Sequence, residues 1–214
     1  MENLDEKTAL IEAALPHVPF DGWSKATLRA AAMDADIAPD IAAMLFPDLP
    51  GDMIDAYVRW SDAAMEARLP DDFDALKVRE KVTTCVRVRL EIAGENEEAT
   101  RVGVRAYAMP KNLRRAARSS WKTADVIWNI CGDTATDYNH YTKRAILSSV
   151  YRSTLLYWLQ DKSDGKADTW AFLDRRIADV MRFEKIKGKV TNRLDKLPFS
   201  KSFFRRQSNE EAAA

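Results

Sequence analysis

Apolar residues recur every three or four positions along most of the chain, which is the spacing of one face of a helix. Residues 4–17, 24–35 and 51–69 follow this pattern, and a short helix fits residues 39–47 between two prolines. Ser24 stands directly before the second of these segments and is a good N-cap. The N-terminal third is therefore predicted to be helical.

The segment from residue 74 to residue 93 fits two patterns. Val86, Val88 and Leu90 alternate with charged residues, which is typical of a strand. Val78 and Val82 fit a helical stripe that also reaches Cys85 and Ile92. Because no neighbouring segment offers a partner strand and an isolated strand is unstable, we predict a helix here.

The second half of the chain contains the longest apolar stripes. Residues 138–160 are apolar around much of the helix circumference, which favours a place in the centre of a bundle. A further helix fits residues 167–181. Between residues 110 and 131 the stripe consists of Leu113, Ala117, Trp121, Ala124, Trp128 and Cys131.

Composition supports the same fold class. The chain has 214 residues, 46 % of them hydrophobic, with only seven Gly and eight Pro, so it can bury a core and favours helices over turns. We predict an all-α helical bundle with an amphipathic C-terminal helix. The expected divisions are residues 1–69, the bundle 70–181, a basic amphipathic membrane-binding helix 182–206 and a disordered tail 207–214.

Few residues can carry catalysis or hold a metal. The two cysteines, Cys85 and Cys131, form no CxxC motif and are expected to be buried free thiols in a reducing compartment. The two histidines, His17 and His140, belong to no metal-binding motif, and no phosphate-binding glycine loop or nucleophile motif is present. We therefore expect no cofactor, no metal and no catalytic residue, and we expect His140 to be exposed.

The net charge of zero hides an asymmetry along the chain. Residues 1–58 contain three bases and eleven acids, whereas residues 182–206 contain nine bases and two acids. A basic helix with an apolar stripe and aromatic anchors favours an anionic membrane surface, although docking on the same bundle or on a dimer mate is the alternative. The candidate membrane-binding residues are Phe183, Ile186, Val190, Leu194, Leu197, Phe199, Phe203 and Phe204.

Residues 22–58 resemble the helix-turn-helix region of TetR regulators, with Thr27-Leu28-Arg29 and Phe46-Pro47 at matching places. DNA binding needs cations for the phosphates and donors for the base edges. The segment in the place of the recognition helix, residues 39–47, contains no Lys or Arg and carries Asp40. The sequence therefore predicts a TetR-like shape without DNA binding.

Three further stretches carry a more specific resemblance. They are LIEAALPHVPFDGW at residues 10–23, GDTATDYNHYTKRAILSSVYRSTLLYWLQD at 132–161 and DTWAFLDRRIADVM at 168–181. Together they resemble the coenzyme Q (ubiquinone) biosynthesis accessory family over most of residues 8–185, except that mitochondrial members often have Trp in place of His140. The resemblance implies a TetR-like homodimer whose hydrophobic pocket holds an isoprenoid lipid and which presents quinone intermediates to a membrane-bound hydroxylase. It does not imply catalysis.

Two sets of residues are candidates for binding. Aromatic and apolar residues of two neighbouring helices either fill the core or line a lipid pocket, since both need the same residue types. These lipid-binding candidates are Trp121, Trp128, Tyr141, Val150, Tyr151, Leu155 and Trp158. A polar and aromatic cluster at the start of the central helix has the composition of an interface. These partner-binding candidates are Asp137, Tyr138, Asn139, His140 and Tyr141.

The interpretation is a non-enzymatic, lipid-binding accessory protein of ubiquinone biosynthesis. Its expected partners are an isoprenoid lipid or quinone intermediate, a ubiquinone-pathway hydroxylase, an anionic membrane surface and a second copy of the chain, but no DNA. The N-terminus carries acids where a targeting segment would carry arginines. We expect a cytoplasmic protein that is peripheral on the inner face of the bacterial inner membrane. The alternative is a TetR-type transcriptional regulator that senses a hydrophobic ligand.

Overall fold

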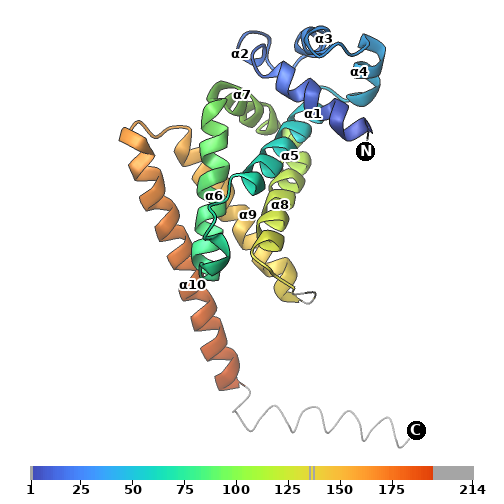
Figure 1. The fold of residues 1–214 in the computed structure, drawn as a ribbon. Coiled ribbons are helices and arrows are strands. Elements are labelled where there is room, and N and C mark those ends of the chain that lie inside the picture. Colours follow the sequence, from blue (N-terminus) through green and yellow to red (C-terminus); the bar gives the residue numbers. More distant parts are fainter. Residues whose placement is uncertain (1, 135, 137, 195–214) are drawn as a thin grey trace, which may run out of the picture. The chain divides into compact units, whose positions relative to one another are not determined.

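Short helices at the N-terminus pack around a core that includes Leu10, Trp23 and Phe46. The structure is a computed structural model, and its backbone describes residues 2–134, 136 and 138–194, with side chains for 4–134, 136 and 138–180. The helices are α1 (Glu2–Ala14), α2 (Val18–Asp21), α3 (Lys25–Asp34) and α4 (Pro39–Leu45) (Figure 1). The hydroxyl of Ser24 accepts the backbone N–H groups of Ala26 and Thr27 at 3.1 and 3.3 Å, which confirms the predicted N-cap.

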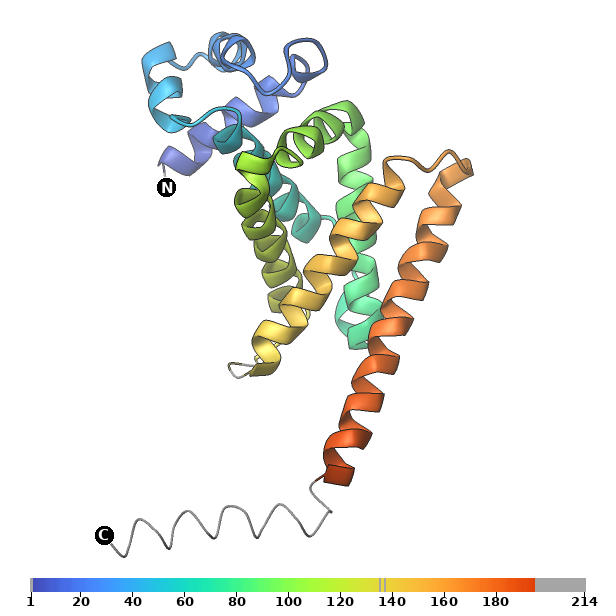
Figure 2. The same cartoon turned by 180° about the vertical axis from the view of Figure 1, so that it is seen from behind.

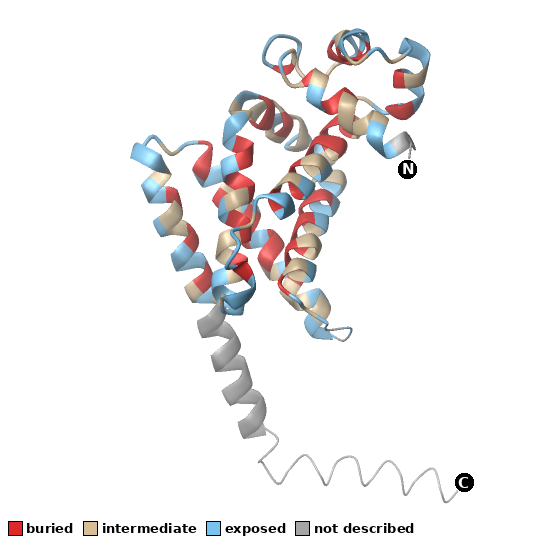
Figure 3. Cartoon of the chain, viewed as in Figure 1, coloured by how far each residue is buried: buried red, intermediate tan, exposed pale blue. Residues whose placement is uncertain are grey.

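A bundle of longer helices follows. It contains α5 (Gly51–Ala67), α6 (Val78–Glu95), α7 (Glu97–Tyr107), α8 (Leu113–Ile130) and α9 (Tyr138–Trp158), with 3-10 turns at Phe73–Ala75 and Pro110–Asn112. Helix α5 packs on α6 and α8, and α9 contacts both α8 and α6. Figure 2 shows α9 running between α8 and α6 when the molecule is viewed from behind. The buried residues follow one face of α5, α6 and α8 (Figure 3).

The predicted all-α class is confirmed, because the described residues contain helices and turns but no strand. The ambiguous segment around Val86 is the helix α6, and it buries Val82, Cys85 and Leu90 together with Val86. The alternation of apolar and charged residues is compatible with this helix because Arg89, one of the charged residues, is buried as well. Both apolar and charged positions therefore lie on the inner face.

Other parts of the chain differ from the sequence prediction. The short helix α2 and the helix α7 were not predicted, and α10 runs without interruption from Ala167 to Leu194, past the expected end at residue 181. A 3-10 turn at Asp164–Lys166 precedes it. The chain divides into two units between Leu173 and Asp174. The eight candidate membrane-binding residues and the expected tail 207–214 lie outside the described side chains, so these assignments and the division at residues 69 and 181 stay predictions.

An arginine of α8 joins the bundle to the helix-turn-helix-like part. Arg115 donates hydrogen bonds to Asp48 and Asp55 at 2.8 Å each, and also to Asp52. Gly51 begins α5 directly beneath this guanidinium, where a Cβ atom would overlap it. The three carboxylates and the glycine therefore fix the position of α8 against the first turn of α5.

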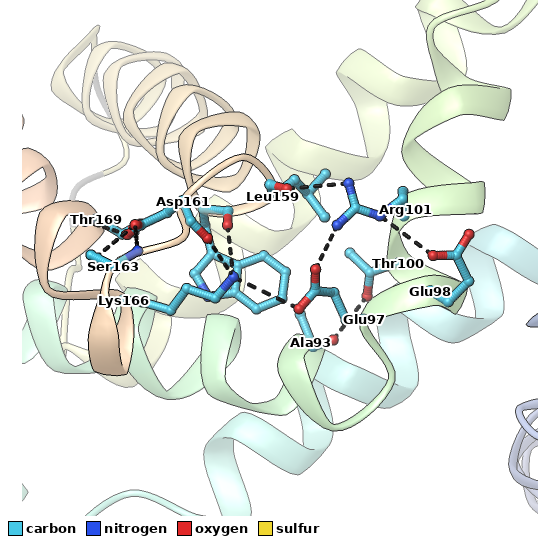
Figure 4. A network of polar contacts seen from close by, with 11 residues as sticks. Ala93, Glu97, Glu98, Thr100, Arg101, Leu159, Asp161, Ser163, Lys166 and Thr169 are labelled. Carbon is cyan, nitrogen blue, oxygen red and sulfur yellow. Dashed lines mark hydrogen bonds and ion pairs between the residues drawn. The ribbon is translucent and has the colours of Figure 1, made fainter.

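A second polar network holds the start of α7 against the connection between α9 and α10 (Figure 4). Arg101 donates to Glu97 at 2.5 Å and to the carbonyl of Leu159 at 3.2 Å. Lys166 donates to the carbonyls of Trp158 and Asp161 and lies 3.7 Å from Glu97. Figure 4 shows these groups converging from three segments, so the turn after α9 is anchored to α7.

Candidate ligand cavity

A cavity of about 290 Å³ lies between α5, α6, α7, α8 and α9. Most of the side chains around it are apolar, as in sites that bind small organic molecules or lipid chains. Its walls are formed by Ile54, Tyr57, Val58, Arg89, Thr100, Gly103, Val104, Tyr107, Ala108, Leu113, Ala116, Ser119, Ser120, Thr123, Tyr151, Arg152, Leu155 and Leu156.

The cavity reaches the surface between the start of α8 and the end of α9. Leu113 and Leu156, which line it from these two helices, are 55 % and 50 % exposed. Ala108 and Arg152 are exposed lining residues as well. Single exposed apolar side chains are common on protein surfaces, but exposed apolar side chains that border a cavity indicate a binding site. The opening is therefore bordered by apolar side chains, with one cation, Arg152, beside them.

One buried lining residue, Arg89, forms an ion pair with Asp62, which lies behind the cavity wall. Arg89 of α6 is 3 % exposed and donates from Nε to Asp62 Oδ1 of α5 at 2.8 Å. The hydroxyl of Thr123 on α8 lies 3.2 and 3.0 Å from the two carboxylate oxygens of Asp62. Charges so far from water need partners of this kind. The pair joins three helices at the inner end of the cavity.

Burial and pairing act in opposite directions on these two groups. Desolvation raises the pKa of Asp62, although Arg89 and Thr123 oppose the rise. Burial alone would lower the pKa of Arg89, but Tyr151 and Asp62 raise it above its ordinary value. The guanidinium therefore stays charged inside the bundle.

Other hydroxyls in the wall are satisfied by the protein itself. Tyr57 and Thr100 share a hydrogen bond of 2.8 Å, and Thr100 also donates to the carbonyl of Ala93 at 3.3 Å. Ser120 donates to the carbonyl of Ala116 at 3.0 Å and accepts from Ser148 at 3.2 Å. These groups line the cavity without needing a ligand, so most of its polar surface is structural.

Two of the seven lipid-binding candidates, Tyr151 and Leu155, line the cavity. Val150 and Trp158 are buried elsewhere in the bundle. The other three candidates lie outside the cavity walls, near the opposite end of α8 and the start of α9: Trp121, Trp128 and Tyr141. The rings of Trp121 and Tyr141 are 6.3 Å apart, and Nε1 of Trp128 is buried with no hydrogen-bond partner among the described residues.

Sequence reasoning missed most of the cavity wall. The predicted stripe of α8 included Leu113 and Ala117, but both are exposed. The buried face of α8 instead contains Ser119, Ser120 and Thr123. The hydroxyl of Ser120 donates to a helix carbonyl, and that of Thr123 bonds to the ion pair. Periodicity of apolar residues gives no signal for such a face. Leu113 was predicted to belong to the apolar stripe of this helix, but it was not predicted to border the opening of a cavity.

The candidate partner surface at the start of α9 is aromatic and largely exposed. Tyr138 and Tyr141 are 71 % and 62 % exposed, and Asn139 is exposed beside them. His140 is half-buried rather than exposed as expected, because its ring packs edge-on against Tyr141 at 5.1 Å. Asp137 lies outside the described residues.

The remaining candidate chemistry resolves into structural contacts. His17 Nε2 lies 2.7 Å from Asp34 Oδ2, joining the ends of α1 and α3. Cys85 and Cys131 are buried free thiols, as predicted, and a hydrogen bond between them raises the pKa of Cys85 and lowers that of Cys131. Within the described part of the chain, no three His, Cys, Asp or Glu side chains cluster as metal ligands. Nor does any described helix have the length and apolar character required to cross a membrane.

Similarity to known proteins extends over most of the chain, and a family model matches the part that contains α8 and α9. The family model described as COQ9 matches residues 113–184. A ubiquinone biosynthesis protein COQ9, mitochondrial, from Xenopus tropicalis is 29 % identical over 180 residues, covering 80 % of this chain and 56 % of that protein. The Homo sapiens protein of the same name is 26 % identical, with 80 % and 56 % covered. A probable ubiquinone biosynthesis protein coq9 from Dictyostelium discoideum is 25 % identical, with 86 % and 62 % covered.

The chain spans little more than half the length of these curated relatives. A solved structure of a TetR transcriptional regulator from Nitrosomonas europaea superimposes with a TM-score of 0.63, covering 81 % of this chain and 97 % of that one at 18 % identity. That likeness concerns the fold alone. The comparisons confirm the resemblance found in the sequence: the chain has a TetR-like fold and is similar to the COQ9 family of ubiquinone biosynthesis proteins.

Proposed function

We propose that this protein is a non-enzymatic accessory protein of ubiquinone biosynthesis that holds an isoprenoid lipid in its cavity and presents quinone intermediates to a membrane-associated hydroxylase. The observation that carries the proposal is the apolar cavity that opens between Leu113 and Leu156. An apolar chain buried there would be removed from water at a gain of about 0.8 kcal/mol per CH₂ group. The similarity to ubiquinone biosynthesis proteins supplies the pathway.

The start of α9 supports the part of the proposal that concerns the hydroxylase. Exposed tyrosines at Tyr138 and Tyr141 are the residue type that contributes most to protein interfaces, and Asn139 adds a polar group between them. We assign this surface, Asp137 to Tyr141 in the sequence, to the hydroxylase. A homodimer of the TetR-like fold belongs to the same proposal.

The basic segment 182–206 supports attachment to a membrane. Its nine bases and its phenylalanines suit a surface rich in anionic lipid, with about 1 kcal/mol for each cation near the surface. In this proposal the protein is cytoplasmic and binds the inner face of the bacterial inner membrane. Attachment would bring the protein to the bilayer from which it takes its lipid.

A TetR-type regulator that senses a hydrophobic ligand is the alternative. Its recognition helix would be α4, Pro39–Leu45, whose one charged residue is Asp40 and whose exposed side includes Met44. Helix α4 offers no cation for the phosphates and places an anion there instead. A gel shift on duplex DNA across a range of salt concentrations should show no salt-dependent complex, and such a complex would favour the regulator.

The lipid proposal is tested by native mass spectrometry of the purified protein and extraction of the lipid that it carries. Ala116→Trp would fill the cavity from α8, whereas Ala117→Trp adds the same bulk at an exposed neighbouring position. We expect bound lipid in the wild type and in Ala117→Trp, and little in Ala116→Trp. The absence of lipid from the wild type, or equal lipid in both variants, would contradict the proposal.

A further inference from the structure

The guanidinium at the inner end of the cavity has hydrogen-bond donors that the protein does not use. Among the described residues, the hydrogen bond of Arg89 runs from Nε to Asp62, and no acceptor faces its two terminal amino groups. These groups belong to the cavity wall and are not enclosed by protein atoms. A buried Arg whose amino groups face an empty space has donors available for a ligand.

A second unused group stands beside the first. Tyr151 of α9 is buried and lines the same cavity, and its ring lies 5.9 Å from the guanidinium carbon of Arg89. Within the described part of the chain its hydroxyl has no hydrogen-bond partner, in contrast to the hydroxyls of Tyr57 and Thr100. Polar groups that remain unpaired in the interior cost about 1–3 kcal/mol each unless a ligand or water satisfies them.

The charge balance decides which kind of ligand fits. Asp62 and Arg89 neutralise each other, and Thr123 donates to the same carboxylate. A ligand with its own negative charge would add an uncompensated charge to a buried site, which is costly. An uncharged oxygen acceptor would satisfy the free donors of Arg89 and Tyr151 without that cost.

The polar and apolar parts of the wall occupy different depths. Arg89, Thr123 and Tyr151 are buried, whereas Leu113 and Leu156 are half-exposed at the opening. An amphiphile that matches this gradient would place its polar head inside and its apolar chain toward the surface.

We infer that the inner end of the cavity is a headgroup site in which Arg89 and Tyr151 bind an uncharged oxygen of a ring, such as a quinone carbonyl or a phenol, with the attached apolar chain running out past Leu113 and Leu156. This inference rests on the proposed function, because it requires that the cavity hold a lipid. It adds the residues that bind the ring and the direction of entry. The ring is held inside the cavity while the lipid is carried, so its presentation to the hydroxylase requires that it leave Arg89 and Tyr151.

Three probes that carry the same decyl chain separate the contribution of the head group to binding from that of the apolar chain. They are 2-decyl-1,4-benzoquinone, decylbenzene and 4-decylbenzoate, each titrated into delipidated full-length protein and followed by calorimetry. We expect the quinone to bind on the order of ten-fold more tightly than decylbenzene, as one or two hydrogen bonds to buried donors would give. The benzoate should bind no better than decylbenzene near neutral pH.

Variants of the protein then test which residues cause the preference for the quinone over decylbenzene. Arg89→Met combined with Asp62→Leu removes the ion pair without leaving a lone charge. It should lower the affinity for the quinone to the level that Tyr151 alone supports, while the affinity for decylbenzene is unaffected. Tyr151→Phe keeps the ring and removes one donor, so it should weaken quinone binding alone by about three-fold to ten-fold. Arg79→Met is the matched control, because Arg79 lies on the same helix as Arg89 but is exposed and does not line the cavity. Tyr151→Phe keeps the test decisive if the double variant fails to fold.

The outcomes separate the headgroup site from the cavity. If decylbenzene and the quinone bind equally well, water occupies the inner end and the headgroup inference fails while the lipid cavity stands. The inference is also wrong if the benzoate binds most tightly. The same holds if the preference for the quinone over decylbenzene is undiminished in both Tyr151→Phe and the double variant. If none of the three probes binds, both the inference and the proposed lipid cavity fall.

Discussion

Two arginines of the bundle are almost equally hidden from water but use their donors differently. Arg144, near the start of α9, is 2 % exposed, and Arg89, at the inner end of the cavity, is 3 % exposed. The acceptors around Arg144 are Asp125, Asp133 at 3.1 Å, Asn129 at 3.3 Å and the carbonyl of His140 at 3.3 Å. Arg89 has a single protein acceptor, Asp62, and an aromatic ring.

The difference separates a cation that holds the fold from one that is available for binding. Arg144 has its guanidinium surrounded by acceptors from the end of α8, the following loop and α9, so it fastens the α8–α9 connection. Arg89 holds α6 to α5 through Nε and turns its amino groups to the cavity. Burial alone does not tell these roles apart, whereas the number of donors left without an acceptor does.

The largest expected effect is on the fully bonded arginine. Arg144→Met should lower the free energy of unfolding by about 3–5 kcal/mol, because Asp133, itself only 6 % exposed, would lose a buried cation. Urea unfolding followed by circular dichroism measures the change. Arg152→Met, at an exposed position of the same helix, should stay within about 0.5 kcal/mol of the wild type. A loss below about 1 kcal/mol for Arg144→Met would remove the distinction between the two arginines.

An intermediate effect is expected at the cavity. Arg89→Met alone should cost about 3 kcal/mol, because Asp62 would remain buried without its cation. Adding Asp62→Leu should return the free energy of unfolding to within about 1–2 kcal/mol of the wild type, since an apolar pair of similar volume replaces the ions. The same urea experiment tests both. If the double variant is as unstable as the single one, the ion pair itself, and not its charge balance, stabilises the bundle.

The smallest expected effect is on the pH dependence of stability. Burial alone would raise the pKa of Asp133, but hydrogen bonds and charges from Lys143 and Arg144 hold it below the ordinary value of about 4. Asp133 therefore contributes stability that is present above about pH 4 and is lost as the pH falls through its lower folded value. Asp62 has a raised pKa, so it takes up a proton in the folded state first and its contribution to stability grows as the pH falls.

The contributions of Asp133 and Asp62 to the free energy of unfolding can be distinguished by unfolding measurements between about pH 6 and pH 3. Asp133→Asn should make the free energy of unfolding decrease less steeply at the low end of this pH range. The double variant Arg89→Met with Asp62→Leu should make that loss steeper, because the opposing contribution of Asp62 is gone. Glu91→Gln on the exposed face of α6 is the control and should leave the profile unchanged. Identical profiles for all variants would contradict the opposite shifts.

Much of the fold follows from local pattern, because helix signals act within a few residues. Ser24 caps α3 as predicted, and the helix at Val86 could be chosen over a strand because no partner strand was at hand. Helix α7 was missed because its residues 97–107 include four charged side chains, which hide its short apolar face. Charge patterns of this kind are compatible with a loop as well as with a helix.

The cavity was less predictable, because its inner end depends on contacts between distant residues. Arg89 finds Asp62 from another helix, and Thr123 reaches the same carboxylate from a third. In the sequence Arg89 is one of several arginines in an alternating pattern, and nothing local marks it as buried. Aromatic residues such as Trp121 were better signalled, yet a sequence does not show whether an aromatic side chain meets a cavity or the protein.

The glycine beneath Arg115 has a consequence for how this chain can vary. Any other residue at Gly51 would push the guanidinium away from Asp52 and Asp55, so the harm of the change depends on what occupies position 115. In a library that randomises both codons, larger residues at 51 should survive selection mainly alongside short ones at 115. The two positions, 64 apart in sequence, would then behave genetically as a single locus.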